Sequence, residues 1–225
     1  MIEYHTRAGH FVIRQADESD ASSRAEIQQV CFPTLAADEL LQEVHFANHS
    51  RIFPEGQLVV IDKSADKIIA SSSSLRMGFP TVDHSFMEAT DQLWITGSHQ
   101  PEGEWLYQFD IGVLPEYRGL GHSKVIYQLQ QQLVRDLGMK GQITVGMTIG
   151  YEKYKDSLSI EEYCEKLRKE ELTDPTVTPQ RKAGFQWVSP VYNYVDDPRA
   201  GNCSIFMAWP LQGVRLEDYL PNMKK

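Results

Sequence analysis

The stretch that decides the fold spans residues 113–128 and reads Val-Leu-Pro-Glu-Tyr-Arg-Gly-Leu-Gly-His-Ser-Lys-Val-Ile-Tyr-Gln. It has the pattern of a strand end, a tight loop of small residues and the first turns of an amphipathic helix. A glycine-rich turn between a strand and a helix leaves several backbone N–H groups without partners. It directs them, with the positive end of the helix dipole, at one point. The stretch therefore predicts a binding site for a phosphate or pyrophosphate.

Two familiar phosphate loops do not fit this stretch. A Walker loop requires Gly-x-x-x-x-Gly-Lys-Ser/Thr, and the chain has no such string. A dinucleotide fingerprint requires a third glycine where Lys124 stands, and it lies early in a βαβ unit rather than in the middle of a chain. Residues 118–123 instead fit the pattern Arg/Gln-x-x-Gly-x-Gly/Ala, with Ser123 in the last small-residue position, after a strand that ends in Val-x-Pro.

Through this string the chain resembles the GCN5-related N-acetyltransferases, whose loop of this form holds the pyrophosphate of acetyl-CoA. The resemblance covers about residues 10–210. It implies an α/β (α+β) acyl-CoA N-acyltransferase fold, with a mixed central sheet, splayed central strands and helices on both faces. A narrower resemblance, to the acetyltransferase-like domain fused to some bacterial carbon–nitrogen hydrolases, is carried by residues 150–156, 174–176, 183–185, 193–194 and 201–202. We expect no hydrolase domain in these 225 residues, so that comparison supplies no acceptor.

The order of the predicted elements agrees with such a fold. We expect strands at 11–14, 57–61, 67–77, 104–113, 143–149, 185–194 and 203–209. We expect helices from Asp17 to about residue 31, around 40–47, near 86–93, after the loop to residue 137, at 159–172 and at 174–183. The serine run at 71–74 lies between apolar residues, which favours strand over linker. Near-continuous apolar content at 104–113 indicates a strand buried on both faces.

Composition limits the class of protein. The chain has 225 residues, 41% hydrophobic and 24% charged, which is typical of one globular core. We therefore expect a single acetyltransferase-like domain over residues 1–225, with an insertion at about 151–175. No apolar run is long enough for a membrane span, the start does not look like a signal peptide, and the three scattered cysteines suggest reduced thiols in a cytoplasmic protein.

The net charge indicates which classes of partner the protein is expected to bind. A formal charge of −9 argues against nucleic acid as the main partner and is compatible with a cationic amine. We expect no membrane partner. The sequence leaves the oligomeric state open, a homodimer included.

The resemblance also implies the cofactor, acetyl-CoA, and the residues that bind it. The pantetheine arm would pair with backbone groups of residues 111–113, and the loop amides would hold the pyrophosphate. Arg118 either adds charge or fixes the loop, and His122 either touches phosphate or is an exposed loop histidine. The candidate cofactor-binding residues are Ile111, Gly112, Val113, Arg118, Gly119, Leu120, Gly121, His122, Ser123 and Lys124.

Catalytic residues are less apparent from the pattern. Acetyl transfer needs an acceptor for the amine proton and donors for the developing oxyanion and thiolate. Where several family members have a basic glutamate on the central strand, this chain has Tyr107. Asp110 is the nearest carboxylate, and a bulge could turn it into the cleft. The alternative is a buried aspartate hydrogen-bonded to loop amides.

The usual general acid, a tyrosine four residues before the Gly-Phe pair, is replaced by Gln180. Tyr151 and Tyr154 are candidate replacements, with packing aromatics as the alternative reading, and proton removal through ordered water stays open. His45 and His49 are four residues apart on one predicted helix face. No third ligand accompanies them, so we expect no metal.

The sequence thus predicts an acetyl-CoA-dependent N-acetyltransferase that acts on the primary amine of a small molecule or a protein. One rival is a non-catalytic acyl-CoA-binding sensor or interaction module, favoured by the missing glutamate and tyrosine. A second rival, a nucleotide-binding enzyme, predicts tighter binding of ATP or NAD than of CoA.

Overall fold

The centre of the protein is an eight-stranded sheet with the order β1-β2-β3-β4-β5-β6-β8-β7. The computed structural model describes residues 1–220. All neighbouring strands are antiparallel except β5 and β6, which are parallel. The strands are β1 (Ile2–Thr6), β2 (Gly9–Gln15), β3 (Gln57–Asp62), β4 (Lys67–Met77), β5 (Trp105–Val113), β6 (Gly141–Met147), β7 (Gln186–Tyr192) and β8 (Cys203–Pro210).

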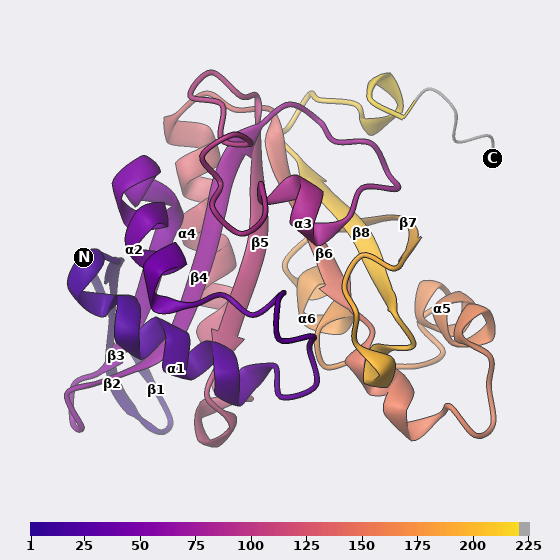
Figure 1. Ribbon diagram of the computed structural model, residues 1–225, viewed down its shortest axis with the longest axis horizontal. Coiled ribbons are helices and arrows are strands. Elements are labelled where there is room, and N and C mark those ends of the chain that lie inside the picture. The colour runs from indigo at the N-terminus through magenta and orange to yellow at the C-terminus, as the bar shows by residue number, and fades with distance from the viewer. Residues whose placement is uncertain (221–225) are drawn as a thin grey trace.

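Helices cover both faces of this sheet. They are α1 (Ala21–Cys31), α2 (Glu43–Ile52), α3 (Phe86–Ala89), α4 (His122–Asp136), α5 (Ile160–Arg168) and α6 (Val177–Lys182). In Figure 1, α1 and α2 lie in front of the sheet and α4 lies behind it. The front core packs Phe46 of α2 and Phe86 of α3 near Trp105 and Tyr107 of β5. Behind the sheet, Val134 of α4 packs with Leu106. The predicted fold class is confirmed.

Local sequence patterns locate most elements to within a few residues. The hairpin of β3 and β4 forms as expected, and the serine run is part of β4, where Ser71, Ser72, Ser73 and Ser74 are all buried. Two expectations need correction. The second helix begins at Glu43, so Leu40 and Leu41 precede it, and the helix expected near 86–93 has only four residues.

Strand β1 was not predicted. Its residues are mostly exposed and have no apolar run, so the strand depends on its ladder with β2 rather than on local hydrophobicity.

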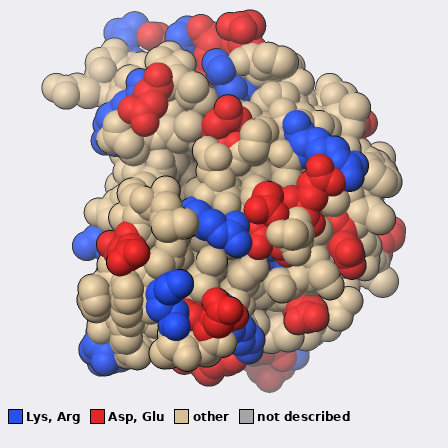
Figure 2. Space-filling view, turned by 90° about the vertical axis from the view of Figure 1, so that its left-hand side faces the viewer, with Lys and Arg blue, Asp and Glu red and all other residues tan. Residues whose placement is uncertain are grey.

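On the face shown in Figure 2, acidic and basic side chains are interspersed and form no continuous basic patch. Within residues 1–220, no helix combines the length and the apolar character that a membrane crossing requires.

Candidate functional site

The two parallel central strands pair over only part of their length. Ladder pairs join β5 to β6 from Trp105 and Gly141 to Gln108 and Thr144, and no pair follows. Beyond that point β5 stays on β4 as far as Val113, while β6 stays on β8 as far as Met147. The inner edges of the two strands therefore separate and leave backbone groups of residues 109–113 without a ladder partner on the β6 side. The predicted splay is confirmed.

A β-bulge lies where the splay begins. Ser74 is opposite Gln108 and Ser73 is opposite Asp110, so Phe109 is the extra residue. Before the bulge, Gln108 faces α4, where it hydrogen-bonds to Gln130. After it, Gly112 lies against α1, since a Cβ there would be 2.8 Å from the side chain of Ile27. Side chains alternate along a strand, so Asp110 faces the same side as Gly112, toward α1.

The loop before α4 has the free amides that its sequence predicts. In residues 1–220, no protein atom accepts a hydrogen bond from the amides of residues 119–124. Gly119 and Gly121 have φ angles of +73° and +91°, which favour glycine. Apart from the adjacent residues in the chain, no heavy atom of the described residues lies within 4 Å of a Cβ built at either. The amides and the start of α4 thus form an open turn, called the anion turn below, whose geometry suits an anion.

Two adjoining cavities connect this turn with the splay. The larger, of about 610 Å³, is lined by Arg118, Gly119, Gly121, His122, Ser123 and Lys124 together with residues of α6. The smaller, of about 160 Å³, lies between the separated strands and α1. Its walls are mostly apolar: Phe32, Phe86, Phe109, Val145, Met147, Ile149, Tyr194 and Val195. The two cavities share Cys31, Phe32, Ile111, Arg118, Ile149 and Thr176.

Asp110 lines the smaller cavity and is 7% exposed. Burial raises the pKa of its carboxyl to about 7, and the charge of Arg24 opposes that rise. Within the described chain no group donates a hydrogen bond to this carboxylate, so it is not held by loop amides. The carboxylate is therefore poised to exchange a proton near neutral pH and is free to meet a ligand.

The side chains of the predicted loop residues have different surroundings. Arg118 donates from Nε to the carbonyl of Val113 at 2.9 Å, which ties the loop to the end of β5. His122 is buried rather than exposed: its Nδ1 is hydrogen-bonded to the hydroxyl of Tyr4 at 2.6 Å, and its ring packs against Phe11. The amide of His122, rather than its imidazole, faces the anion turn. Lys124 and Ser123 line the larger cavity.

The two tyrosines considered as general acids lie outside both cavities. Tyr151 donates to the carbonyl of Leu158 at 3.1 Å, and both rings pack around Tyr163 near α5. Their surroundings agree with the alternative reading, packing aromatics. Gln180 does line the smaller cavity, where its Nε2 donates to Thr144. Its buried Oε1 accepts from no donor within residues 1–220.

A tyrosine that the sequence did not single out reaches the smaller cavity. Tyr194 lines it, and its hydroxyl is 2.8 Å from that of Tyr107, which in turn is 2.6 Å from Nε2 of His84. Nδ1 of His84 faces the carbonyl of Thr81, which can only accept, so Nδ1 carries the proton. Burial lowers the pKa of His84, so the imidazole is neutral and Nε2 accepts. Tyr107 therefore donates to His84, and Tyr194 donates to Tyr107.

This direction leaves the Tyr194 oxygen as an acceptor toward the cavity rather than a proton donor. No local spacing connects these residues, because His84 lies in the irregular segment before β5 and Tyr194 follows β7.

The histidine pair has structural contacts of its own. His49 is fully buried and its Nε2 donates to the carbonyl of Leu93 at 2.7 Å, while Nδ1 of His45 accepts from the amide of Gln42. Among residues 1–220, no group of three or more His, Cys, Asp or Glu side chains is arranged to hold a metal ion.

Comparison with known proteins gives two curated relatives, while no protein-family model matches. "Uncharacterized N-acetyltransferase YkwB" of Bacillus subtilis (strain 168) is 32% identical over 200 residues, which span 88% of this chain and 87% of that protein. "Probable hydrolase YhcX" of the same organism is 31% identical over 217 residues, which span 95% of this chain. The matched region is 40% of the length of that relative, so this chain spans less than half of it.

Solved structures share the fold at low identity. The loading GNATL domain of CurA from Lyngbya majuscula has a TM-score of 0.74 at 17% identity and covers 91% of this chain and 99% of its own. The GNAT-like decarboxylase GphF, solved in complex with isobutyryl-CoA, has a TM-score of 0.73 at 17% identity, over 89% of this chain and 100% of its own. The acetyltransferase yncA from Salmonella typhimurium, solved with acetyl-CoA, has a TM-score of 0.54 at 11% identity, over 91% of this chain and 95% of its own.

Proposed function

Because the chain belongs to the GCN5-related N-acetyltransferase superfamily, we propose that it transfers an acetyl group from acetyl-CoA to a primary amine. The observation that carries the proposal is the run of unpartnered amides at residues 119–124, beside a cavity that opens into the strand splay. An anion turn alone would suit many phosphates. Its position next to unpaired strand edges suits a ligand with a phosphate end and an extended amide-bearing arm.

The cofactor residues follow from this geometry. The amides of residues 119–124 hold the pyrophosphate, aided by the dipole of α4. Backbone groups of Ile111, Gly112 and Val113 pair with the pantetheine arm, as a further strand pairs with a sheet edge. Arg118 positions the loop through Val113 and adds positive charge near the phosphates. The thioester then lies at the junction of the two cavities. CoA thioesters in two of the structural neighbours support this choice of ligand.

Asp110 is the proton acceptor in this proposal. With a pKa raised to about 7, a substantial fraction of the carboxyl is ionised at neutral pH and still basic enough to take a proton from an amine. The neutral amine attacks the thioester carbonyl, the C–N bond forms, the C–S bond breaks, and CoA departs as a thiolate. The proton lost by nitrogen goes to Asp110 and then, through solvent, to the thiolate. Holding both substrates in one cleft supplies much of the remaining acceleration.

The smaller cavity suggests a compact acceptor. Its volume of about 160 Å³ is close to that of an engineered cavity, about 150 Å³, which holds one benzene ring. Its walls are mainly aromatic and aliphatic. We therefore propose a small amine with an apolar substituent of about ring size, in preference to a lysine presented on a protein surface.

The test is release of CoA thiol from acetyl-CoA with amines graded in size and polarity. We expect turnover with compact apolar amines, and a loss of about 100-fold or more in Asp110→Asn, as for removal of a general base. Asp38→Asn, an exposed aspartate of the same chemistry, is the matched control and keeps full activity.

Binding is tested separately by calorimetry with CoA, ATP and NAD. We expect CoA to bind most tightly and Gly121→Glu to abolish binding, since a carboxylate there enters the anion turn. Gly138→Glu also replaces an uncrowded positive-φ glycine but lies beyond α4, so it retains binding. Tight CoA binding without turnover of any amine would favour the sensor module, and tighter ATP or NAD binding would favour a nucleotide enzyme.

A further inference from the structure

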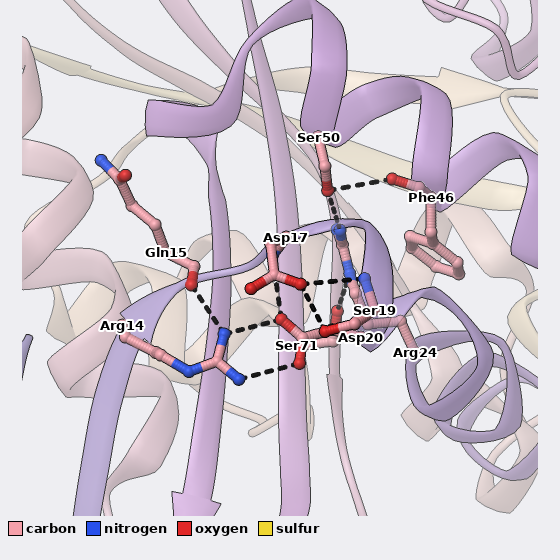
Figure 3. Close-up of polar contacts among 9 residues, drawn as sticks. All are labelled: Arg14, Gln15, Asp17, Ser19, Asp20, Arg24, Phe46, Ser50 and Ser71. Carbon is pink, nitrogen blue, oxygen red and sulfur yellow. Dashed lines mark hydrogen bonds and ion pairs between the residues drawn. The ribbon is translucent and has the colours of Figure 1, made fainter.

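Arg24 of α1 is a fully buried cation whose hydrogen-bond partners are all neutral. Its guanidinium donates to Ser73 Oγ at 2.7 Å, Ser71 Oγ at 3.0 Å, Gln57 Oε1 at 3.1 Å and Ser50 Oγ at 3.3 Å. The ring of Phe46 lies 4.4 Å from its central carbon. Figure 3 shows Arg24 between Ser50 and Ser71. Over residues 1–220, no carboxylate oxygen lies within ion-pair distance of it.

A buried arginine without a counter-charge destabilises the folded state. Taking a charge out of water is costly unless it is paired, and hydroxyl dipoles only partly replace the lost hydration. Burial lowers the pKa of Arg24 only to about 10, so it remains a cation at neutral pH. A buried positive charge that persists needs a negative charge nearby to balance it.

Two carboxylates are close enough to interact with this charge, Asp110 and Asp20. Asp20 is already paired: Arg14 donates to both of its oxygens, at 2.6 Å and 2.8 Å (Figure 3). Asp110 has no such partner. Ser73, which accepts the shortest hydrogen bond of Arg24, is directly opposite Asp110 in the β4–β5 ladder. Because the bulge turns Asp110 toward α1, Ser73 and Asp110 face the same side of neighbouring strands, which are about 4.8 Å apart. Arg24 of α1 packs over Ser73 on that side.

We propose that Arg24 is a positioning residue: a buried counter-charge that keeps the Asp110 carboxylate ionised without binding it, so that its oxygens stay free for the acceptor amine. The proposal rests on the proposed function, in which Asp110 takes the amine proton. A direct Arg–Asp pair would occupy the carboxylate and make it a weak base. A cation held one strand away by serines offsets part of the desolvation and leaves the oxygens unoccupied.

The other titratable groups around this pair do not supply the same charge. Cys31 of α1 has a pKa raised by burial, so its thiol is neutral. Burial lowers the pKa of His49 of α2 to about 3, so its imidazole is also neutral. Arg118 is exposed and anchored on Val113. Asp197 and the partly exposed Arg199 also line the smaller cavity, where Asp197 accepts from Thr34 and from the amide of Arg199. The charge that opposes the rise in the pKa of Asp110 is that of Arg24 rather than that of Arg199.

The test compares Arg24→Met, which removes the charge, with the wild type. The readouts are the pH dependence of kcat/KM and a direct titration of Asp110 followed through its ¹³C-labelled carboxyl resonance. We expect both to move to higher pH by about one pH unit or more, as when an opposite charge near a carboxylate is removed. At the acidic end of the profile, kcat/KM is proportional to the ionised fraction of Asp110. A shift of the profile by one pH unit therefore lowers kcat/KM tenfold there. The Kd for CoA stays unchanged, since Arg24 lines neither cavity.

Arg51→Met removes an exposed arginine of α2 that pairs with Glu18, and it serves as the control, in which we expect no change in either titration. If Arg24→Met does not fold, Arg24→Gln replaces it, because an amide retains hydrogen bonds to the serines without the charge. An Asp110 titration that stays in place in a folded variant overturns the inference. Failure of the proposed function is recognised separately, by a wild type that turns over no amine or by an Asp110→Asn variant that keeps full turnover. In either case the carboxyl titration of the wild type and of Arg24→Met still reports on Arg24.

Discussion

Asp110 differs from the other aspartates of the chain because of two neighbours. The extra residue Phe109 turns it toward α1, and Ser73 across the ladder brings it near the buried Arg24. Neither effect follows from the identity of the residue. An aspartate in the same strand without a bulge would face α4, where the amides of Gln108 and Gln130 form a hydrogen-bonded network. Backbone register therefore decides whether this carboxyl faces the network beside α4 or the smaller cavity.

The raised pKa of Asp110 predicts how stability changes with pH. The native state binds the proton of the Asp110 carboxyl more tightly than the unfolded state does. The stability that the protonated carboxyl contributes is therefore lost as pH rises from about 4 to about 7. Asp110→Asn removes that dependence. We expect the variant to gain stability relative to the wild type between pH 4 and pH 8, by about 1.4 kcal/mol for each pH unit between the unfolded and folded pKa values. Urea unfolding at pH 4 and at pH 8 measures this gain, and an equal difference at both would contradict it.

At the scale of elements, the anion turn depends on a strand far from it in sequence. The first residue of α4, His122, is held by the hydroxyl of Tyr4 in β1 and by the ring of Phe11 in β2. The glycines allow the turn, but this contact helps to fix the first turn of the helix. Edge strand β1 therefore stabilises the start of α4 in addition to extending the sheet.

The Tyr4→Phe variant tests whether β1 stabilises the anion turn. Removing one hydrogen bond of about 0.5–1.5 kcal/mol should loosen the turn and weaken CoA binding by roughly two- to tenfold. The fold should persist, because the ring still packs on Phe11. Calorimetry with CoA measures the effect, and Tyr192→Phe, at an exposed tyrosine, is the control. Equal affinity in both variants would mean that β1 does not support the turn.

For the whole molecule, the incomplete pairing of β5 and β6 opens the sheet. Each strand is held by its outer neighbour along its full length, so the separation of the inner edges does not unravel the sheet. We propose that the chain is one domain, because the sheet is continuous from β1 to β7 and the smaller cavity is lined by residues of both β5 and β6. The segment at 151–175 carries α5, which packs on β8 through Cys164 and Cys203.

A ligand that occupies the splay should stabilise the whole fold. At a CoA concentration of 100 times Kd, linkage contributes about 2.7 kcal/mol, or about 5–10 °C in Tm for a chain of this size. Thermal unfolding with and without CoA measures this rise. We expect it in the wild type and in Gly138→Glu but not in Gly121→Glu. A rise in Gly121→Glu as well would place the ligand outside the anion turn.

The sequence by itself determined what depends on near neighbours along the chain. Periodic apolar residues, caps and glycines at positive φ act within a few positions, so the order of helices and strands, the anion turn and the identity of the fold could be predicted. The region of the splay followed from the family resemblance.

Only the tertiary structure decided which side chains meet at the site. Arg24 and Ser73 are 49 positions apart, and Tyr107 and Tyr194 are 87 apart. The bulge that turns Asp110, the burial of His122 and the packing of Tyr151 and Tyr154 around Tyr163 likewise come from pairing and burial between distant segments. Such contacts leave no periodic trace in the sequence, because they depend on sheet register and on which faces are brought together.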